Sequence, residues 1–112
     1  LKKNKNYNGL NEIYYDIGKG KIQERFFKKD GKKDGVYKGY YESGELEYIA
    51  NYVDDELQGE EKKYYDNGEL FSIINYVDGS LEGEEKVYYK SGKLKSTVNY
   101  VDGLLEGERK NY

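Results

Sequence analysis

The side chains in this sequence with the clearest chemical potential are carboxylates, which recur in groups. Glu60 and Glu61 are followed 24 residues later by Glu84 and Glu85, and Asp54, Asp55 and Glu56 form a third group. Two carboxylates can act as acid and base in glycoside hydrolysis, provided that a concave site raises the pKa of one of them. Carboxylates at a fixed period along the chain are typical of a solvated surface instead. We therefore predict no catalytic residue and no enzyme activity.

Metal and nucleotide chemistry find no support in the sequence. The chain contains no His and no Cys, which excludes imidazole bases, imidazole ligands and thiolate sites. The acidic run after Asn51 lacks the alternating oxygen ligands and central Gly of a calcium loop. Residues 18–21, GKGK, lack the spacing of a phosphate-binding loop and are predicted to form a hairpin turn. We expect no metal and no cofactor.

The charge distribution argues against nucleic acid as a partner. Residues 1–34 carry 10 Lys and Arg against 5 Asp and Glu, whereas residues 35–112 carry 9 against 17. A nucleic-acid-binding protein normally concentrates basic residues on one face. Here only the first third is basic, and residues 1–8 are interpreted as a basic N-terminal tail. Nucleic acid binding is not expected.

A regular row of Lys and Tyr residues is the more promising surface. Its members recur at the repeat period and are the candidate binding residues Lys38, Tyr40, Lys62, Tyr64, Lys86 and Tyr88. Rings and ammonium groups in a row could bind a partner protein, an anionic lipid headgroup or a glycan. The alternative is that Lys stems shield Tyr rings from water and stabilise the sheet.

The elements that position these residues come from an internal repeat. Three units of 24 residues, 35–58, 59–82 and 83–106, agree at 11 positions, including a Tyr pair and an Asn-Tyr-Val-Asp run. Residues 9–34 form a longer first unit, and residues 107–112 open a fifth. Together residues 9–112 are expected to form one repeat domain.

Two turn signals divide each unit into two strands. Asn67-Gly68 and Asp78-Gly79 are predicted to form two-residue type I′ turns, with Asp54-Asp55 as a weaker version of the second. With these turns as pivots, Tyr65 lies opposite Leu70, Glu61 opposite Ile74 and Tyr76 opposite Leu81. The predicted fold is all-β: an elongated, single-layer antiparallel meander of stacked β-hairpins. Tyr65, Leu70, Ile74, Tyr76 and Leu81 are expected on one face, and the Lys and Tyr row on the other.

The glycine that opens each unit is given a structural role. The same register places Gly35, Gly59 and Gly83 opposite Tyr52, Tyr76 and Tyr100. A Tyr ring folded onto a sheet glycine covers exposed backbone. We therefore expect a larger side chain at Gly83 to displace the Tyr100 ring.

The repeated pattern, with Tyr-Tyr, Ser/Asn-Gly, Asn-Tyr-Val-Asp-Gly and Leu-Glu-Gly in order, resembles the MORN repeat in its bacterial variant form. The resemblance covers residues 9–112 and implies an elongated sheet of stacked hairpins. It implies binding rather than catalysis: some such proteins are antitoxin-like, and others are scaffolds or phospholipid-contacting modules appended to phosphatidylinositol phosphate kinases.

The functional hypothesis is a non-enzymatic repeat module that binds a protein partner in an antitoxin-like or scaffolding role. The alternative is peripheral contact with phospholipid or envelope glycan, without kinase activity. We also predict that residues 107–112 form an edge strand through which two copies, or a partner strand, associate. The sequence indicates neither a cytoplasmic nor an exported location, and an export signal upstream of Leu1 stays open.

Overall fold

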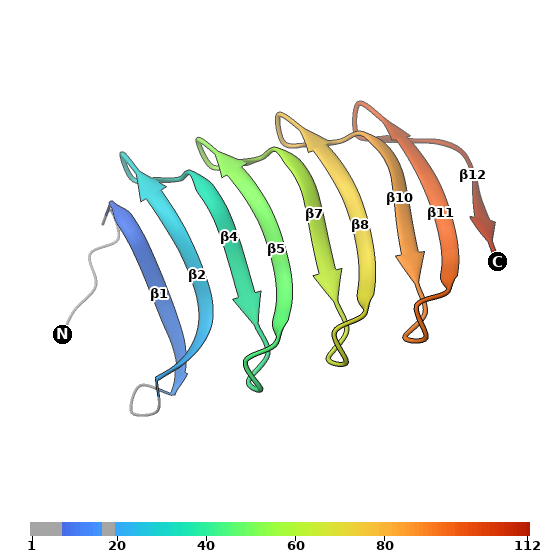
Figure 1. Cartoon of the computed structure of the whole chain (residues 1–112). Helices are drawn as coiled ribbons and strands as arrows, with labels where there is room; N and C mark the ends of the chain where they lie inside the picture. Colours follow the sequence, from blue (N-terminus) through green and yellow to red (C-terminus); the bar gives the residue numbers. More distant parts are fainter. Residues whose placement is uncertain (1–7, 17–19) are drawn as a thin grey trace.

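The computed structural model describes residues 8–16 and 20–112, and the described part of the chain is built of strands and turns (Figure 1). The strands, in chain order, are β1 (Gly9–Asp16), β2 (Lys21–Lys29), β3 (Lys32–Lys33), β4 (Gly35–Tyr40), β5 (Leu46–Val53), β6 (Glu56–Leu57), β7 (Gly59–Tyr64), β8 (Leu70–Val77), β9 (Ser80–Leu81), β10 (Gly83–Tyr88), β11 (Leu94–Val101) and β12 (Leu104–Asn111).

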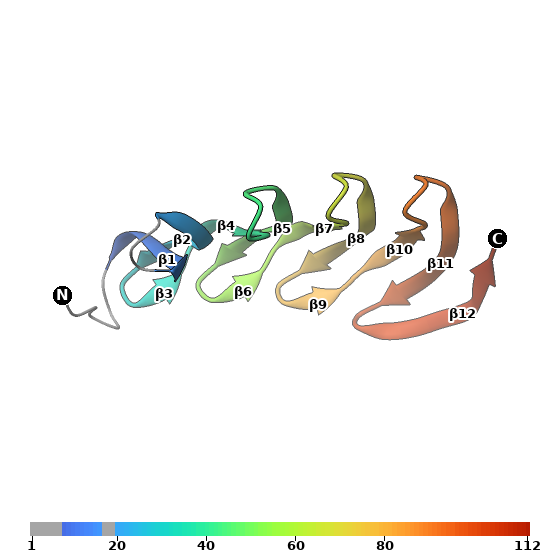
Figure 2. The ribbon, with the colours of Figure 1, turned by 90° about the horizontal axis from the view of Figure 1, so that it is seen from below.

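All strands belong to one antiparallel sheet in which chain neighbours pair. The order along the sheet is β1-β2-β4-β5-β7-β8-β10-β11-β12, and the short β3, β6 and β9 extend the pairing of β2, β5 and β8. The strands lie side by side as arcs in Figure 1, and the view from below shows that every hairpin bends in the same sense (Figure 2). The predicted all-β meander of stacked hairpins is confirmed.

The turn after Asn-Tyr-Val-Asp is the predicted type I′ turn. Asp78 and Gly79 have φ of 50° and 84°, and Tyr76 pairs with Leu81. Asp54 and Asp55 form the same turn with φ of 49° and 70°. Asp55 tolerates this backbone and also accepts a 2.7 Å hydrogen bond from the backbone N–H of Lys33 through its Oδ1 atom. Asp55, which the sequence predicted to be a weaker turn residue than Gly, therefore links two units.

The turn after the Tyr pair differs from the prediction. The N–H of Gly68 donates to the carbonyl of Tyr65, and the N–H of Tyr65 donates to the carbonyl of Glu69. Gly68 has φ of 89°, whereas Asn67 is not among the positive-φ residues. This is a three-residue hairpin loop, a type I turn followed by Gly in the left-handed region. Asn67 caps it by accepting the N–H of Glu69, so the predicted two-residue turn is wrong.

The longer loop is accompanied by a β-bulge that changes the face of one predicted residue. Lys63 pairs with Ser72 and Tyr64 with Leu70, so the register skips Phe71. Opposed residues share a face, which puts Leu70 beside Tyr64 and not with Ile74 as predicted. Away from the bulge the predicted pairs, Glu61 with Ile74 and Gly59 with Tyr76, are confirmed.

The core is a single file of side chains, one per unit. The buried hydrophobic residues of the described chain recur every 24 residues and are Phe26, Ala50, Ile74 and Val98. A single-layer sheet can bury only positions that are covered on both sides by neighbouring rows. Val98, at 1% exposed, is the most deeply buried of the four.

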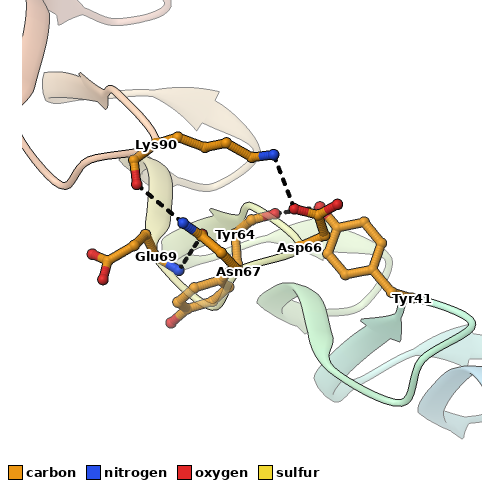
Figure 3. A network of polar contacts seen from close by, with 6 residues as sticks. All are labelled: Tyr41, Tyr64, Asp66, Asn67, Glu69 and Lys90. Atoms are coloured by element: carbon orange, nitrogen blue, oxygen red, sulfur yellow. Dashed lines mark hydrogen bonds and ion pairs between the residues drawn. The ribbon is translucent and has the colours of Figure 1, made fainter.

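Tyrosine hydroxyls join neighbouring units along one end of the sheet. The second Tyr of each pair donates to the carbonyl of the first Tyr in the next unit: Tyr41 to Tyr64 at 2.5 Å, and Tyr65 to Tyr88 at 2.7 Å. Figure 3 shows the Tyr41 contact with its neighbours, where Asn67 Nδ2 also donates to the carbonyl of Lys90. We call Tyr15, Tyr41, Tyr65 and Tyr89 the stapling tyrosines, since Tyr15 and Tyr89 make the same contact.

Candidate binding groove

The face that carries Ile74 is hollowed into an open groove of about 670 Å³. Every hairpin is bent (Figure 2). Aromatic rings from both ends of the hairpins line the hollow. Its walls include stapling tyrosines at one end of the strands and Tyr52 at the other. The other residues that line the groove include Gln23, Glu24, Lys33, Tyr37, Glu47, Tyr48, Lys63, Tyr64 and Phe71.

An aromatic cluster closes the groove at the side of the first unit. The ring of Tyr37 stacks on Phe26 with centroids 5.3 Å apart, and its edge meets Tyr48 at 5.8 Å. The Lys33 Nζ atom lies 4.9 Å from the centroid of Tyr37 and 5.2 Å from that of Tyr52. Cation–π attraction of this kind holds an ammonium group against ring faces. Lys33 therefore fills the space that these rings enclose.

Two groove tyrosines donate hydroxyl hydrogen bonds to carboxylates. Tyr48 donates to Glu61 Oε2 at 2.8 Å, and Tyr37 donates to Glu24. Burial, followed by the hydrogen bond and the negative charge of the carboxylate, raises the pKa of both phenols well above the ordinary value of 10.0. These phenols stay neutral at physiological pH and act as donors. Glu24 and Glu61 therefore fix the positions of the Tyr37 and Tyr48 rings.

The lysines of the predicted Lys and Tyr row lie on the opposite face, whereas Tyr64 is also among the residues that line the groove. The register puts Lys38 and Lys62 on either side of Ile49, and Lys86 beside Ile73, while Tyr64 pairs with Leu70. The row, Lys38, Tyr40, Lys62, Tyr64, Lys86 and Tyr88, is half-buried throughout. Its lysines do not contribute ammonium groups to the groove, and its role in binding stays a prediction.

Two of these lysines are neutralised by their own strand. Lys62 Nζ lies 3.7 Å from Glu60, and Lys86 Nζ lies 3.8 Å from Glu84. Both pairs are largely exposed, so they contribute little to stability. They do reduce the positive potential that an anionic surface would meet.

The glycine prediction is half right. Gly35, Gly59 and Gly83 do pair with Tyr52, Tyr76 and Tyr100. However, a Cβ at Gly59 or Gly83 would meet no atom within 4 Å, and at Gly35 it would meet Phe27 rather than Tyr52. The prediction that a side chain here displaces a Tyr ring is therefore wrong. Glycine is required by a positive φ, 89° at Gly83, where the strand steps from one hairpin to the next.

The groove was not predicted from the sequence. Alternation along the strand assigned Tyr65 to a face, but it did not predict that the Tyr65 hydroxyl reaches the next unit. No role was predicted for Tyr37, Tyr48 or Phe71. The signal was present in the comparison of units. Tyr37 and Tyr48 stand where later units have Glu and Ser, so the aromatic end of the groove departs from the repeat.

The family model for the MORN repeat variant matches residues 33–54, 57–78 and 81–102, more than half of the chain. The chain belongs to the MORN repeat variant family. The three matched MORN repeats have the same 24-residue period as the hairpins and begin two residues before each opening glycine. A comparison with curated proteins finds no match.

MORN repeats are generally binding modules without catalytic activity, and they commonly mediate protein or membrane interactions. Within the described ranges, no group of three or more acidic side chains could hold a metal ion. The same part of the chain contains no helix long and apolar enough to cross a membrane.

Proposed function

We propose that this MORN repeat protein is a non-enzymatic module that binds a segment of a partner protein in its groove. The observation that carries the proposal is the open, ring-lined hollow of about 670 Å³ on the face that carries Ile74. Aromatic rings are favoured in binding surfaces because they give a large contact area with little side-chain entropy to lose. An antitoxin-like or a scaffolding role would both use such a surface.

The exposure of groove residues supports a partner over a purely structural role. Phe71 is 37% exposed although its ring meets Tyr65 at 5.0 Å. Lys63 is exposed, lines the groove and makes no ion pair or hydrogen bond through its side chain within the described residues. Both side chains are available for contacts that the sheet does not supply.

A displayed library of random 12-residue peptides, selected on the immobilised protein, tests the proposal. Adjacent residues of β7 provide matched variants, because Lys63 lines the groove and Lys62 lies on the opposite face. Peptides enriched on the unmodified protein should lose binding to Lys63→Glu and keep it with Lys62→Glu. Enrichment of no peptide, or equal loss with both variants, would contradict groove binding.

The alternative, contact with anionic phospholipid through the Lys and Tyr row, is less well supported. Glu60 and Glu84 offset Lys62 and Lys86, and residues 35–112 are acidic overall. We expect no sedimentation with vesicles of one-third phosphatidylserine at low salt. Salt-sensitive sedimentation that Lys38→Ala or Lys86→Ala abolishes would favour the lipid role instead.

Catalysis, including the kinase activity of proteins that carry such repeats, is not part of the proposed function. A nucleotide that binds the folded protein must raise its stability. We expect ATP with Mg²⁺ to leave the melting temperature unchanged, and a rise that saturates with ATP concentration would overturn this.

A further inference from the structure

Each hairpin carries one residue that the sheet register skips. The register passes from Tyr48 to Leu46 without Glu47, from Ser72 to Leu70 without Phe71, and from Ser96 to Leu94 without Lys95. The first unit skips Gln23 in the same way. A β-bulge leaves its extra residue unpaired and re-aims the side chain. We call Gln23, Glu47, Phe71 and Lys95 the bulge row.

The bulge row lies along the stapling tyrosines at the edge of the groove. Phe71 meets the ring of Tyr65, and Lys95 Nζ lies 5.8 Å from the ring centroid of Tyr89. Glu47 is close enough to Tyr15 and Tyr41 for its negative charge to raise the pKa of both hydroxyls, after the larger effect of burial. Three members of the row, Gln23, Glu47 and Phe71, line the groove directly.

The row changes its chemistry beside a stapling tyrosine that stays the same. The neighbouring stapling position is Tyr in every unit, and the loop that follows it always contains Gly. The bulge position is amide, carboxylate, phenyl and ammonium in turn. The same bulge forms with four different side chains, so folding does not fix the residue type and the position can match a bound segment.

We propose, on the basis of the protein-binding function above, that the bulge row reads an extended peptide segment with a basic, an apolar and an acidic side chain at every third position. The Glu47 carboxylate is exposed and has no ion pair or hydrogen bond in the described part of the chain, so it can pair with a Lys or Arg. Phe71 offers an apolar surface, and the Lys95 ammonium can pair with a carboxylate.

The spacing of the row fits a polyproline II segment. Each unit adds two strands, so equivalent residues lie about 9.6 Å apart. A polyproline II helix has three residues per turn and rises about 9.3 Å per turn, so every third side chain points the same way. Aromatic-lined grooves are the usual sites for such segments.

Two tyrosines that follow the groove residue Tyr52 at the repeat period, Tyr76 and Tyr100, have free hydroxyls that favour an extended segment over an α-helix. The hydroxyls of Tyr76 and Tyr100 donate to no protein atom among the described residues. A polyproline II segment has no internal hydrogen bonds, so its carbonyls can accept from these donors, whereas helix carbonyls are already paired. The bulge row and the hydroxyls of Tyr76 and Tyr100 would thus hold opposite sides of the segment.

Fluorescence anisotropy with synthetic peptides tests the inference. The probe carries lysine, leucine and glutamate three residues apart with prolines between them. A second peptide has leucine first, a third has four-residue spacing, and a fourth carries the same residues at seven-residue spacing on an alanine-rich helix. We expect the first to bind at least about tenfold more tightly than the others, which corresponds to about 1.4 kcal/mol.

Exchange of charge on the protein provides the decisive comparison. Glu47→Lys should weaken the first peptide about tenfold and should bind a version with glutamate in place of lysine more tightly than the unmodified protein does. Lysine is compatible with this site, because Lys95 occupies the equivalent position. Glu45→Lys, in the adjacent exposed loop, is the control and should change neither affinity.

Two outcomes separate this inference from the proposed function. If the displayed library yields groove-dependent peptides without the basic, apolar, acidic order, or if Glu47→Lys causes no reversal, the bulge row does not read the segment although the groove binds one. If no peptide depends on Lys63, the proposed function itself fails, and this inference fails with it.

Discussion

At the scale of single residues, the repeated tyrosines have different roles that their sequence positions do not reveal. Tyr64 and Tyr65 are adjacent and both half-buried. The hydroxyl of Tyr65 joins its unit to the next through the carbonyl of Tyr88, whereas the hydroxyl of Tyr64 makes no hydrogen bond in the described structure. Removing each hydroxyl in turn therefore distinguishes the contribution of the inter-unit hydrogen bond from that of ring packing.

Tyr65→Phe should destabilise the protein by about 0.5–1.5 kcal/mol, the usual net contribution of a hydrogen bond. Tyr64→Phe is the matched control and should change the free energy of unfolding by much less. Urea denaturation of both variants provides the measurement, and equal effects would show that the inter-unit bond does not contribute to stability.

Gly83→Val should lower stability because valine rarely adopts the φ of 89° found there. A cost of about 1–3 kcal/mol is expected for such a backbone. Gly83→Asn should cost less, since asparagine tolerates positive φ, and the open space around a Cβ accommodates either side chain. Thermal melts compare the two variants. A larger loss with asparagine would mean that space, and not φ, selects glycine.

At the scale of the hairpin, alternation along β8 puts neighbouring residues on opposite faces of the sheet. Ile74 is 5% exposed in the central file, whereas its neighbour Ile73 lies half-buried beside Lys62 and Lys86. Truncations at these adjacent positions compare the core with the outer face within one strand.

Ile74→Ala should destabilise by about 2–4 kcal/mol through lost burial and a residual cavity. Ile73→Ala should cost clearly less, because water already reaches that side chain. The midpoints of urea denaturation measure both effects, provided that the dependence on urea concentration is unchanged. Similar losses of stability would mean that a further layer covers the outer face in solution.

The predicted association through the last strand stays a prediction, and the structure now selects the variant that tests it. The N–H of Tyr112 donates to the carbonyl of Lys95, and N–H groups alternate in direction along an antiparallel strand. The N–H of Asn111 therefore points away from β11. Asn111→Pro should abolish self-association in light scattering and leave the hairpins folded, whereas Lys110→Pro should disrupt β12 itself. A monomeric unmodified protein at high concentration would contradict the prediction.

At the scale of the whole molecule, stability is distributed over many equivalent contacts between neighbouring hairpins. Staples join the units at one end, and at the other end the N–H of each type I′ turn reaches the previous unit, as Gly79 does to Leu57. Among the described residues, strands pair within a unit or with the adjacent unit, which is the physical basis of an approximately additive stability. The tyrosines make that stability sensitive to alkaline pH.

The free energy of unfolding should fall as the pH rises above the ordinary phenol pKa of 10.0. Burial and carboxylate neighbours keep Tyr37 and Tyr48 neutral in the folded state, while the unfolded chain ionises first. Urea titrations between about pH 8 and about pH 11 measure the slope. Tyr48→Phe should reduce it, and a profile with no decline above pH 10.0 would contradict the raised pKa values.

The sequence by itself determined the architecture, because its strongest signals are local. The backbone preferences of Asp78 and Gly79 favour a type I′ turn, and two such turn signals in each 24-residue period indicate stacked hairpins with one register. Pairs such as Glu61 with Ile74 followed directly from these pivots. The MORN repeat family was recognisable for the same reason, since its pattern is that of the turns and strands.

The tertiary structure alone decided the groove and the faces next to the bulge. Whether Asn67-Gly68 forms a two- or a three-residue loop depends on competing turn geometries of similar energy, and the longer loop moves Leu70 to the other face. The bend of the sheet arises from all hairpins together, and it brings Tyr37 of one unit against Phe26 of another. Spacing along the chain determines which strands pair, whereas the curvature of the assembled sheet determines which side chains meet across them.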